Sequence, residues 1–142
     1  MKITLKHDLK NIDWKELADV YERAPLGKRD VKQLKRAFQK SWFTCIAMHG
    51  KKIIGAGRII SDGEYYMNIY DIAVLPEFQG KQIGNKIMAA IIKRAGQKFM
   101  LLTTTVGKEG FYHKLGFRKH RAAMAIYPRK RLAYAKKHYL QW

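Results

Sequence analysis

The segment that most constrains the fold spans residues 65–104, where a strand pattern, a glycine-containing loop, a helix pattern and another strand pattern follow one another. YYMNIYDIAVL is strand-like, LPEFQGKQIGNKI opens a helix with Ile83, Ile87 and Ile91 on one side, and KFMLLTTT is strand-like again. Two strands joined by a crossover helix lie parallel in one sheet. The sequence therefore predicts a parallel strand pair.

The preceding residues predict an edge strand, two helices and two further strands of an antiparallel meander. Residues 2–5 alternate, and the capping patterns at Asp13 and Asp30 begin helices, the first over residues 14–23. Strand patterns over residues 42–48 and 52–61 lead through the Asp62-Gly63 hairpin signal to the strand at 65–75. Beyond residue 104, GKEGFYHKLG predicts a short helix, FRKHR and MAIYP predict two final strands, and residues 129–142 predict a basic terminal helix.

The length and the net charge of the chain limit its possible partners. The 142 residues fit one domain, and 29 Lys and Arg against 11 Asp and Glu give a net charge of +18, with no acidic residue after Glu109. Such a charge attracts a phosphorylated cofactor, an acidic substrate or nucleic acid, and a solubilising basic surface explains it equally well.

The sequence also indicates a compartment. The start, MKITLKHDLK, lacks the apolar core of a signal peptide, and no apolar run reaches the roughly 18 residues of a membrane span, so we expect a cytoplasmic protein that does not bind membranes. The single cysteine, Cys45, and five scattered histidines have no metal-ligand spacing, so we expect no metal.

The loop before the predicted central helix has the features of a phosphate site. The N–H groups of residues 80–85 precede or begin the helix, so they are free of helical partners, and the helix dipole favours an anion there. Gly80 and Gly84 allow close approach, and Lys81 adds a cation. The alternative is an ordinary turn between a strand and a helix.

Two separated motifs resemble those of the GCN5-related N-acetyltransferase (GNAT) superfamily, which uses acetyl-coenzyme A (acetyl-CoA). They are YDIAVLPEFQGKQIGNKIM and, some 25 residues later, GFYHKLGF. The superfamily loop reads Gln or Arg, two variable residues, Gly, one variable residue, then Gly or Ala. Here Gln82 stands at the place of the first of these glycines. The resemblance implies one N-acetyltransferase domain over residues 1–142 with an α/β (α+β) fold, a mostly antiparallel sheet of six to seven strands, helices on both faces and a V-shaped split between the two parallel strands.

The resemblance also implies a cofactor site. The pyrophosphate of acetyl-CoA would lie on the loop, and the pantetheine arm would pair with the backbone of the preceding strand, where one amide polarises the thioester carbonyl. The residues at these matching positions are Ile72, Ala73, Val74, Gln79, Gly80, Lys81, Gln82, Ile83, Gly84 and Asn85.

Tyr112 matches the superfamily tyrosine that protonates the departing thiolate, although an aromatic side chain beside Phe111 could equally serve packing. A general base must take a proton from the amine, and the carboxylates proposed for it are Asp71 first and Glu64 second. A solvated strand charge is the alternative for both. We expect Gln82 to alter cofactor affinity without abolishing binding if its backbone is right-handed; a positive φ would strain it.

The resulting prediction is an acyltransferase that moves an acetyl group from acetyl-CoA to a primary amine of a small molecule or peptide by direct attack in a ternary complex. The alternatives are a toxin-like aminoacyl-tRNA acetyltransferase and a non-catalytic CoA-sensing or nucleic-acid-binding module that uses the basic carboxy-terminal segment. Nucleic acid is the less favoured partner, and a homodimer agrees with the many dimeric relatives in the superfamily.

Overall fold

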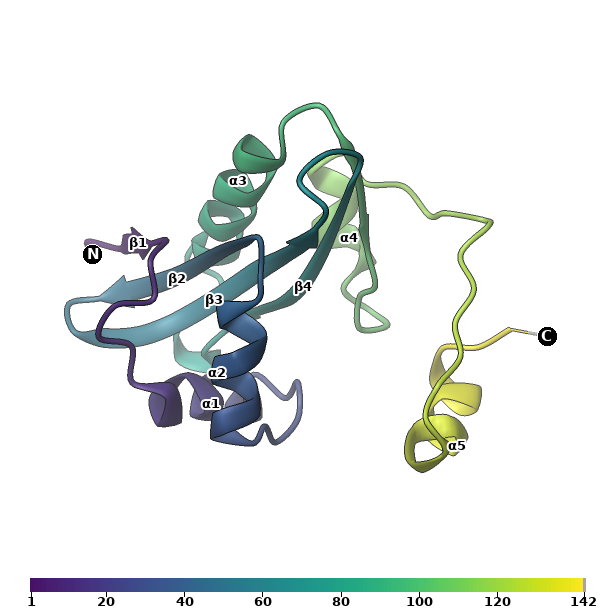
Figure 1. Ribbon diagram of the computed structural model, residues 1–142, viewed down its shortest axis with the longest axis horizontal. Coiled ribbons are helices and arrows are strands. Elements are labelled where there is room, and N and C mark those ends of the chain that lie inside the picture. The colour runs from purple at the N-terminus through teal and green to yellow at the C-terminus, as the bar shows by residue number, and fades with distance from the viewer. Residues whose placement is uncertain (142) are drawn as a thin grey trace. The chain divides into compact units, whose positions relative to one another are not determined.

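Five strands form one mixed sheet in the computed structural model, which describes residues 1–141. The sheet belongs to the first of two compact units, Met1–Leu102, and the second unit begins at Thr103. The first unit contains β1 (Thr4–Lys6), α1 (Trp14–Arg23), α2 (Val31–Gln39), β2 (Phe43–His49), β3 (Lys52–Ser61), β4 (Tyr66–Val74), the 3-10 turn η1 (Pro76–Phe78), α3 (Ile83–Ala95) and β5 (Phe99–Leu102) (Figure 1).

The strand order is β1-β2-β3-β4-β5, and every neighbouring pair is antiparallel except β4 and β5. The predicted parallel pair and crossover helix are therefore confirmed. β5 pairs only with the first part of β4, from Tyr66 opposite Phe99 to Ile69 opposite Leu102. Beyond Ile69, β4 continues to Val74 without a β5 partner, because β5 ends at Leu102. The V-shaped split between the parallel strands stays a prediction.

Helices cover both faces of the sheet, α1 and α2 on one face and α3 on the other (Figure 1). Neighbouring residues of β3 explain the division, because successive residues of a strand point to opposite faces. A Cβ on Gly57 would lie 3.1 Å from both Ile87 and Ile91 of α3, whereas the Arg58 guanidinium lies 5.8 Å from the Phe38 ring of α2. A glycine at residue 57 therefore lets α3 pack closely on the sheet.

Local capping positions the first two helices. Asp13 accepts a hydrogen bond from the Glu16 amide at 3.1 Å, and Asp30 accepts one from the Gln33 amide at 2.9 Å. Both caps were predicted, and α1 spans the predicted residues. Buried apolar side chains of α1, α2, α3 and the sheet form the core, and Cys45 of β2 is fully buried.

The two predicted final strands do not form, so the prediction of six to seven strands is wrong for the residues that the structure describes. Residues 117–127 contain no strand, and the apolar side chains of Met124 and Ile126 are 97% and 101% exposed. At the start of this stretch Arg118 donates hydrogen bonds to the carbonyls of His113 and Phe117. An alternating pattern needs a neighbouring strand to become a strand, and among residues 1–141 no strand pairs with this stretch.

The second unit contains α4 (Glu109–Lys114) and α5 (Arg129–His138). Helix α5 begins directly after Pro128, and it lies within the segment 129–142 for which a basic helix was predicted. The last residue of that segment, Trp142, lies outside the described residues. The prediction of one domain over residues 1–142 stays a prediction. Among residues 1–141, no helix has both the length and the apolar character needed to cross a bilayer.

Candidate functional site

Strand β4 contains one more residue than the stretch of β3 that it faces. Ala56 pairs with Ala73 and Arg58 pairs with Tyr70, so Gly57 of β3 faces both Asp71 and Ile72. Asp71 has a φ of +61°, in the left-handed region that non-glycine residues seldom occupy. This arrangement is a β-bulge, which shifts the alternation of the strand by one residue.

The bulge determines which backbone groups of β4 face the open edge. The Leu75 amide donates to the Ile54 carbonyl of β3 at 2.8 Å, and alternate residues direct their backbone groups to the same side, so Ala73 also faces β3. Val74 therefore faces the edge that β5 does not reach. The Gln79 side chain occupies part of that edge, because its Nε2 donates to the Val74 carbonyl at 3.0 Å.

The loop between η1 and α3 presents a row of free amides. Within residues 1–141, none of the amides of residues 80–85 donates a hydrogen bond, and the first helical bond of α3 runs from the Lys86 amide to the Gln82 carbonyl at 3.1 Å. Gly80 has a φ of +75°, which glycine adopts freely. Free amides at the positive end of a helix are suited to bind a pyrophosphate group.

Gln82 has a left-handed backbone, with φ +66° and ψ 14°, directly before the first residue of α3. The condition under which Gln82 would fit without strain, a right-handed backbone, is therefore not met. A side chain in this conformation costs about 1 kcal/mol relative to glycine. The Gln82 Oε1 atom accepts a hydrogen bond from Asn85 Nδ2, a contact within the loop that glycine could not make.

Asp71 is held by two arginines and is not a free carboxylate. Arg29 donates from Nη2 to Oδ1 at 3.0 Å and from Nη1 to Oδ2 at 3.2 Å, and Arg58 donates from Nε to Oδ2 at 2.7 Å. The Asp71 side chain is only 12% exposed. Burial alone would raise the pKa of Asp71, but the hydrogen bonds and charges of the two arginines outweigh burial and lower the pKa below its ordinary value. A carboxylate so stabilised is a poor general base.

The sequence reasoning missed the two arginines, and it also missed Tyr21, whose hydroxyl donates to the backbone carbonyl of Asp71 at 2.8 Å. No local pattern could have indicated these contacts, because Arg29 and Tyr21 lie 42 and 50 residues from Asp71. The second candidate base, Glu64, precedes β4, whereas the loop follows its end. Nine residues of strand separate them, about 26 Å at the usual rise. Glu64 is therefore far from the loop.

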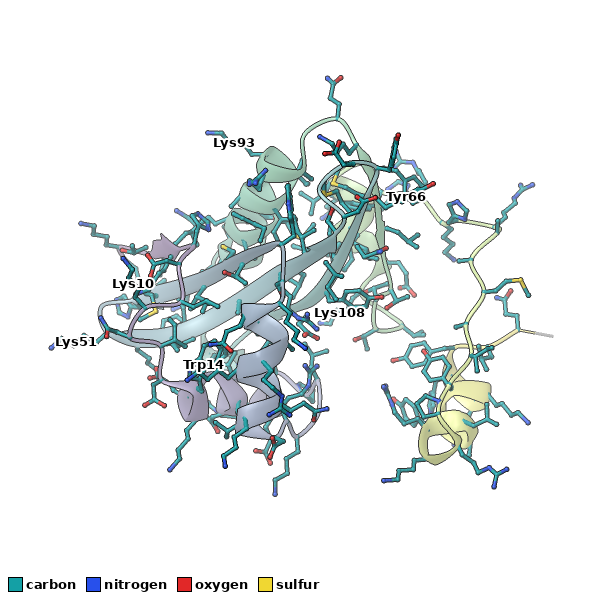
Figure 2. All side chains as sticks on the ribbon, viewed as in Figure 1. Lys10, Trp14, Lys51, Tyr66, Lys93 and Lys108 are labelled. Atoms are coloured by element: carbon teal, nitrogen blue, oxygen red, sulfur yellow. The ribbon has the colours of Figure 1, made fainter. Side chains whose placement is uncertain are left out.

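Further cations lie beside the loop. The Nζ atoms of Lys52 and Lys81 lie 5.5 Å and 5.8 Å from the centre of the Phe78 ring, and the His49 ring lies 5.7 Å from it. Glu77 offsets part of this charge, because it lies 3.7 Å from Lys52. Other lysines, including Lys10, Lys51 and Lys93, extend outward from separate parts of the first unit (Figure 2).

Tyr112, the predicted acid, belongs to α4 in the second unit, whereas the other predicted site residues belong to the first. The Tyr112 ring packs edge-on against Phe111 and Phe117, with ring centres 4.9 Å and 6.1 Å apart. Burial raises the pKa of Tyr112 to about 12. The phenol is therefore protonated at neutral pH, as a proton donor must be.

Comparisons with known proteins identify the family of this chain. Residues 40–119 match the family described as acetyltransferase (GNAT) domain. An uncharacterized N-acetyltransferase, ycf52, from Porphyra purpurea is 30% identical over 129 residues, which cover 83% of this chain and 74% of that protein.

Solved structures share the fold. A probable acetyltransferase of unknown function from meticillin-resistant Staphylococcus aureus superposes with a TM-score of 0.81 at 22% identity, over 90% of this chain and 99% of that one. AAC(6')-Iy, solved in complex with the bisubstrate analogue CoA-S-monomethyl-acetylneamine, superposes with a TM-score of 0.72 at 16% identity, over 91% of this chain and 99% of that one.

Proposed function

Because the chain belongs to the GNAT family of acetyltransferases, we propose that it transfers the acetyl group of acetyl-CoA to a primary amine by direct attack in a ternary complex. Two features together carry the proposal. The β4 edge at Val74 has no β5 partner, and the amides of residues 80–85 donate no hydrogen bond within the described residues. Both lie at the end of one strand, so a single extended ligand can contact both. A bound acetyl-CoA supplies the activated acetyl group.

Backbone groups are proposed to make most of the contacts with acetyl-CoA. The free amides of the loop and the dipole of α3 receive the pyrophosphate, and the Lys81 ammonium adds positive charge. The Val74 N–H faces the open edge, where it can donate to a carbonyl of the bound ligand. A backbone donor fixed in place stabilises the negative charge that develops on a thioester oxygen during attack.

Tyr112 is proposed to donate its proton to the departing thiolate. Its raised pKa keeps the phenol protonated, and an alkyl thiolate is basic enough to accept the proton. We leave Asp71 out of the proton transfer, because its arginine partners lower its basicity. The amine is proposed to attack in its neutral form after losing its proton to water.

The acceptor is proposed to contain a phosphate or carboxylate near its amine. Arg29 and Arg58 supply two positive charges against one from Asp71, and the Arg29 side chain is 29% exposed. Together with the net charge of +18, this surplus favours anionic acceptors over polyamines and aminoglycosides.

The test is release of free thiol from acetyl-CoA in the presence of paired amines that differ in charge. Glucosamine is compared with glucosamine 6-phosphate, an amino acid with its amide, and spermidine serves as a cationic amine. We expect amine-dependent thiol release, faster for the anionic member of each pair, with the acetylated amine identified by mass spectrometry. Release that is independent of every amine would contradict the enzymatic proposal, and a preference for spermidine would contradict the acceptor class.

One observation favours a second candidate, binding of RNA or acetylation of aminoacyl-tRNA. No acidic residue follows Glu109, and α5 contains Arg129, Lys130, Arg131, Lys136 and Lys137. Any protein this basic binds nucleic acid weakly, with strong salt dependence. The discriminating assay is therefore acetyl transfer to aminoacyl-tRNA compared with the free amino acid: a higher rate on the tRNA supports this candidate, and equal rates exclude it.

A further inference from the structure

We propose that Tyr21, Arg29 and Arg58 are positioning residues, which hold the β4 bulge so that the Val74 backbone faces the open edge of the sheet. The inference rests on the proposed acetyl transfer, because it gives the bulge a task in that reaction. These three residues are assigned no part in making or breaking bonds. They act through Asp71, which each of them contacts.

Tyr21 fixes the backbone of the bulge directly. Its side chain is fully buried in α1, and its hydroxyl donates to the Asp71 carbonyl at 2.8 Å. A carbonyl in the irregular part of a bulge has lost its regular ladder partner, so a buried donor aimed at it selects the bulged conformation. Leu17, Ala18 and Val20 of the same helix are also buried, which gives this donor little freedom to move away.

Arg29 and Arg58 fix the Asp71 side chain from two different elements. Arg29 comes from the segment between α1 and α2 and also lies over the Tyr21 ring, 4.9 Å from its centre. Arg58 comes from β3, donates to Ser41 Oγ at 3.3 Å and lies 5.8 Å from the Tyr70 ring. Two parallel hydrogen bonds from one guanidinium fix both the orientation and the position of the Asp71 carboxylate. The side chain of Asp71 is therefore held in place as well as its backbone carbonyl.

The contacts of Arg58 reveal the shift in alternation. Arg58 meets the side chains of both Tyr70 and Asp71, two successive residues that would point to opposite faces in a regular strand. They share a face only because of the bulge. Without the bulge, the residues after Asp71 would each shift by one position in the alternation of the strand. The backbone of Ala73 would then face the open edge in place of Val74.

The left-handed backbone of Asp71 makes the contacts necessary. A positive φ at a non-glycine residue persists when the surroundings hold it in place. Here a hydroxyl holds the carbonyl and two guanidiniums hold the carboxylate. Weakening any one of them should loosen the strand after Asp71 while the strand before it keeps its pairing.

Amide hydrogen exchange tests this without any need for turnover. We expect Tyr21→Phe to raise the exchange rate of the Leu75 amide by roughly tenfold, since a hydrogen bond of ordinary strength is lost, and to leave residues 67–69 unchanged. The control is Tyr65→Phe, which removes the same atom from a side chain that is 73% exposed. Equal exchange in wild type and Tyr21→Phe, or a uniform rise along β4, would overturn the proposal.

Kinetics test the role in the reaction. We expect Tyr21→Phe to lower kcat by roughly tenfold at saturating acetyl-CoA and amine, with the Kd for CoA changed less than about twofold. Arg29→Lys, which keeps the charge but loses the fork, should retain more activity than Arg29→Met. A fall in CoA affinity as large as the fall in kcat, or unchanged kcat, would overturn the positioning role. A wild-type protein without turnover on any amine would instead refute the proposed function, and the exchange experiment would still decide whether the bulge is held.

Discussion

The Gln79 side chain donates a hydrogen bond to the Val74 carbonyl at 3.0 Å, which ties the loop before α3 to the open edge of β4. The two residues were predicted as cofactor contacts on separate grounds, one from the loop motif and one from the strand. The structure adds a direct link between them. The link places the start of the phosphate loop relative to the strand that would bind the pantetheine arm.

Gln79→Ala should weaken CoA binding by about three- to tenfold, because the loop loses a hydrogen bond that fixes its position. Isothermal titration calorimetry with CoA measures the change. Gln97→Ala is the matched control, since Gln97 is an exposed glutamine of the turn between α3 and β5. An unchanged affinity in Gln79→Ala would mean that the link does not position the loop.

Gln82→Gly should stabilise the folded protein by about 0.5–1 kcal/mol, because glycine adopts the left-handed backbone without strain but loses more entropy on folding. Urea denaturation measures the free energy of unfolding. Gln82→Asn should lie between wild type and Gln82→Gly, because asparagine tolerates this region better than glutamine. A less stable Gln82→Gly protein would show that the contact between Gln82 and Asn85 outweighs the strain.

Gly84→Glu should abolish CoA binding in calorimetry, because a negative side chain in the first turn of α3 repels the pyrophosphate and fills the space that it needs. Gly84→Ala adds bulk without charge, and alanine suits a helix, so its folded stability should equal or exceed that of wild type. Full CoA affinity in a folded Gly84→Glu protein would disprove the loop assignment.

Tyr112→Phe should lower kcat about a hundredfold with little change in CoA affinity, because the thiolate loses its proton donor. Since the pKa of Tyr112 is raised to about 12, wild-type turnover should not decline through loss of this proton between pH 7 and pH 10. Stopped-time thiol release over that range measures both effects. Tyr134→Phe, a change at a tyrosine 58% exposed on α5, is the control. Equal kcat in Tyr112→Phe and wild type would remove Tyr112 from the reaction.

Asp71→Asn should destabilise the protein by about 2–4 kcal/mol at neutral pH, because two partly buried guanidiniums lose their shared counter-charge. The folded pKa of Asp71 lies below its unfolded value of about 3.9, so its ionised form stabilises the fold. That stabilisation is complete above about pH 4 and is lost as the pH falls through the lowered folded pKa. The difference in unfolding free energy between wild type and Asp71→Asn should therefore shrink in acid. A difference that is independent of pH would contradict the ion pairs.

Features that depend on neighbouring residues could be predicted from the sequence. The caps at Asp13 and Asp30, the hairpin at Asp62 and the free amides of the loop follow from patterns of four to six residues. The crossover between β4 and β5 follows equally well, because the connection is continuous in the chain.

Features that depend on distant residues could not be predicted. Asp71 looked like a candidate base because nothing near it in sequence indicates Arg29 or Arg58. The backbone of Gln82 could not be read from its residue type, which normally avoids a positive φ. The segment MAIYP has the alternation of a strand, yet a strand requires a partner, and alternation carries no information about one.

The burial of Cys45 makes thiol detection selective. This side chain has no exposed surface, and burial raises the pKa of its thiol to about 12, so the folded protein presents no reactive sulfur to a disulfide reagent. A colorimetric thiol reagent will therefore report the coenzyme A set free during turnover without a background from the enzyme. The same reagent added during denaturation will measure the fraction of molecules in which unfolding has exposed Cys45. One reagent can therefore measure both turnover and unfolding.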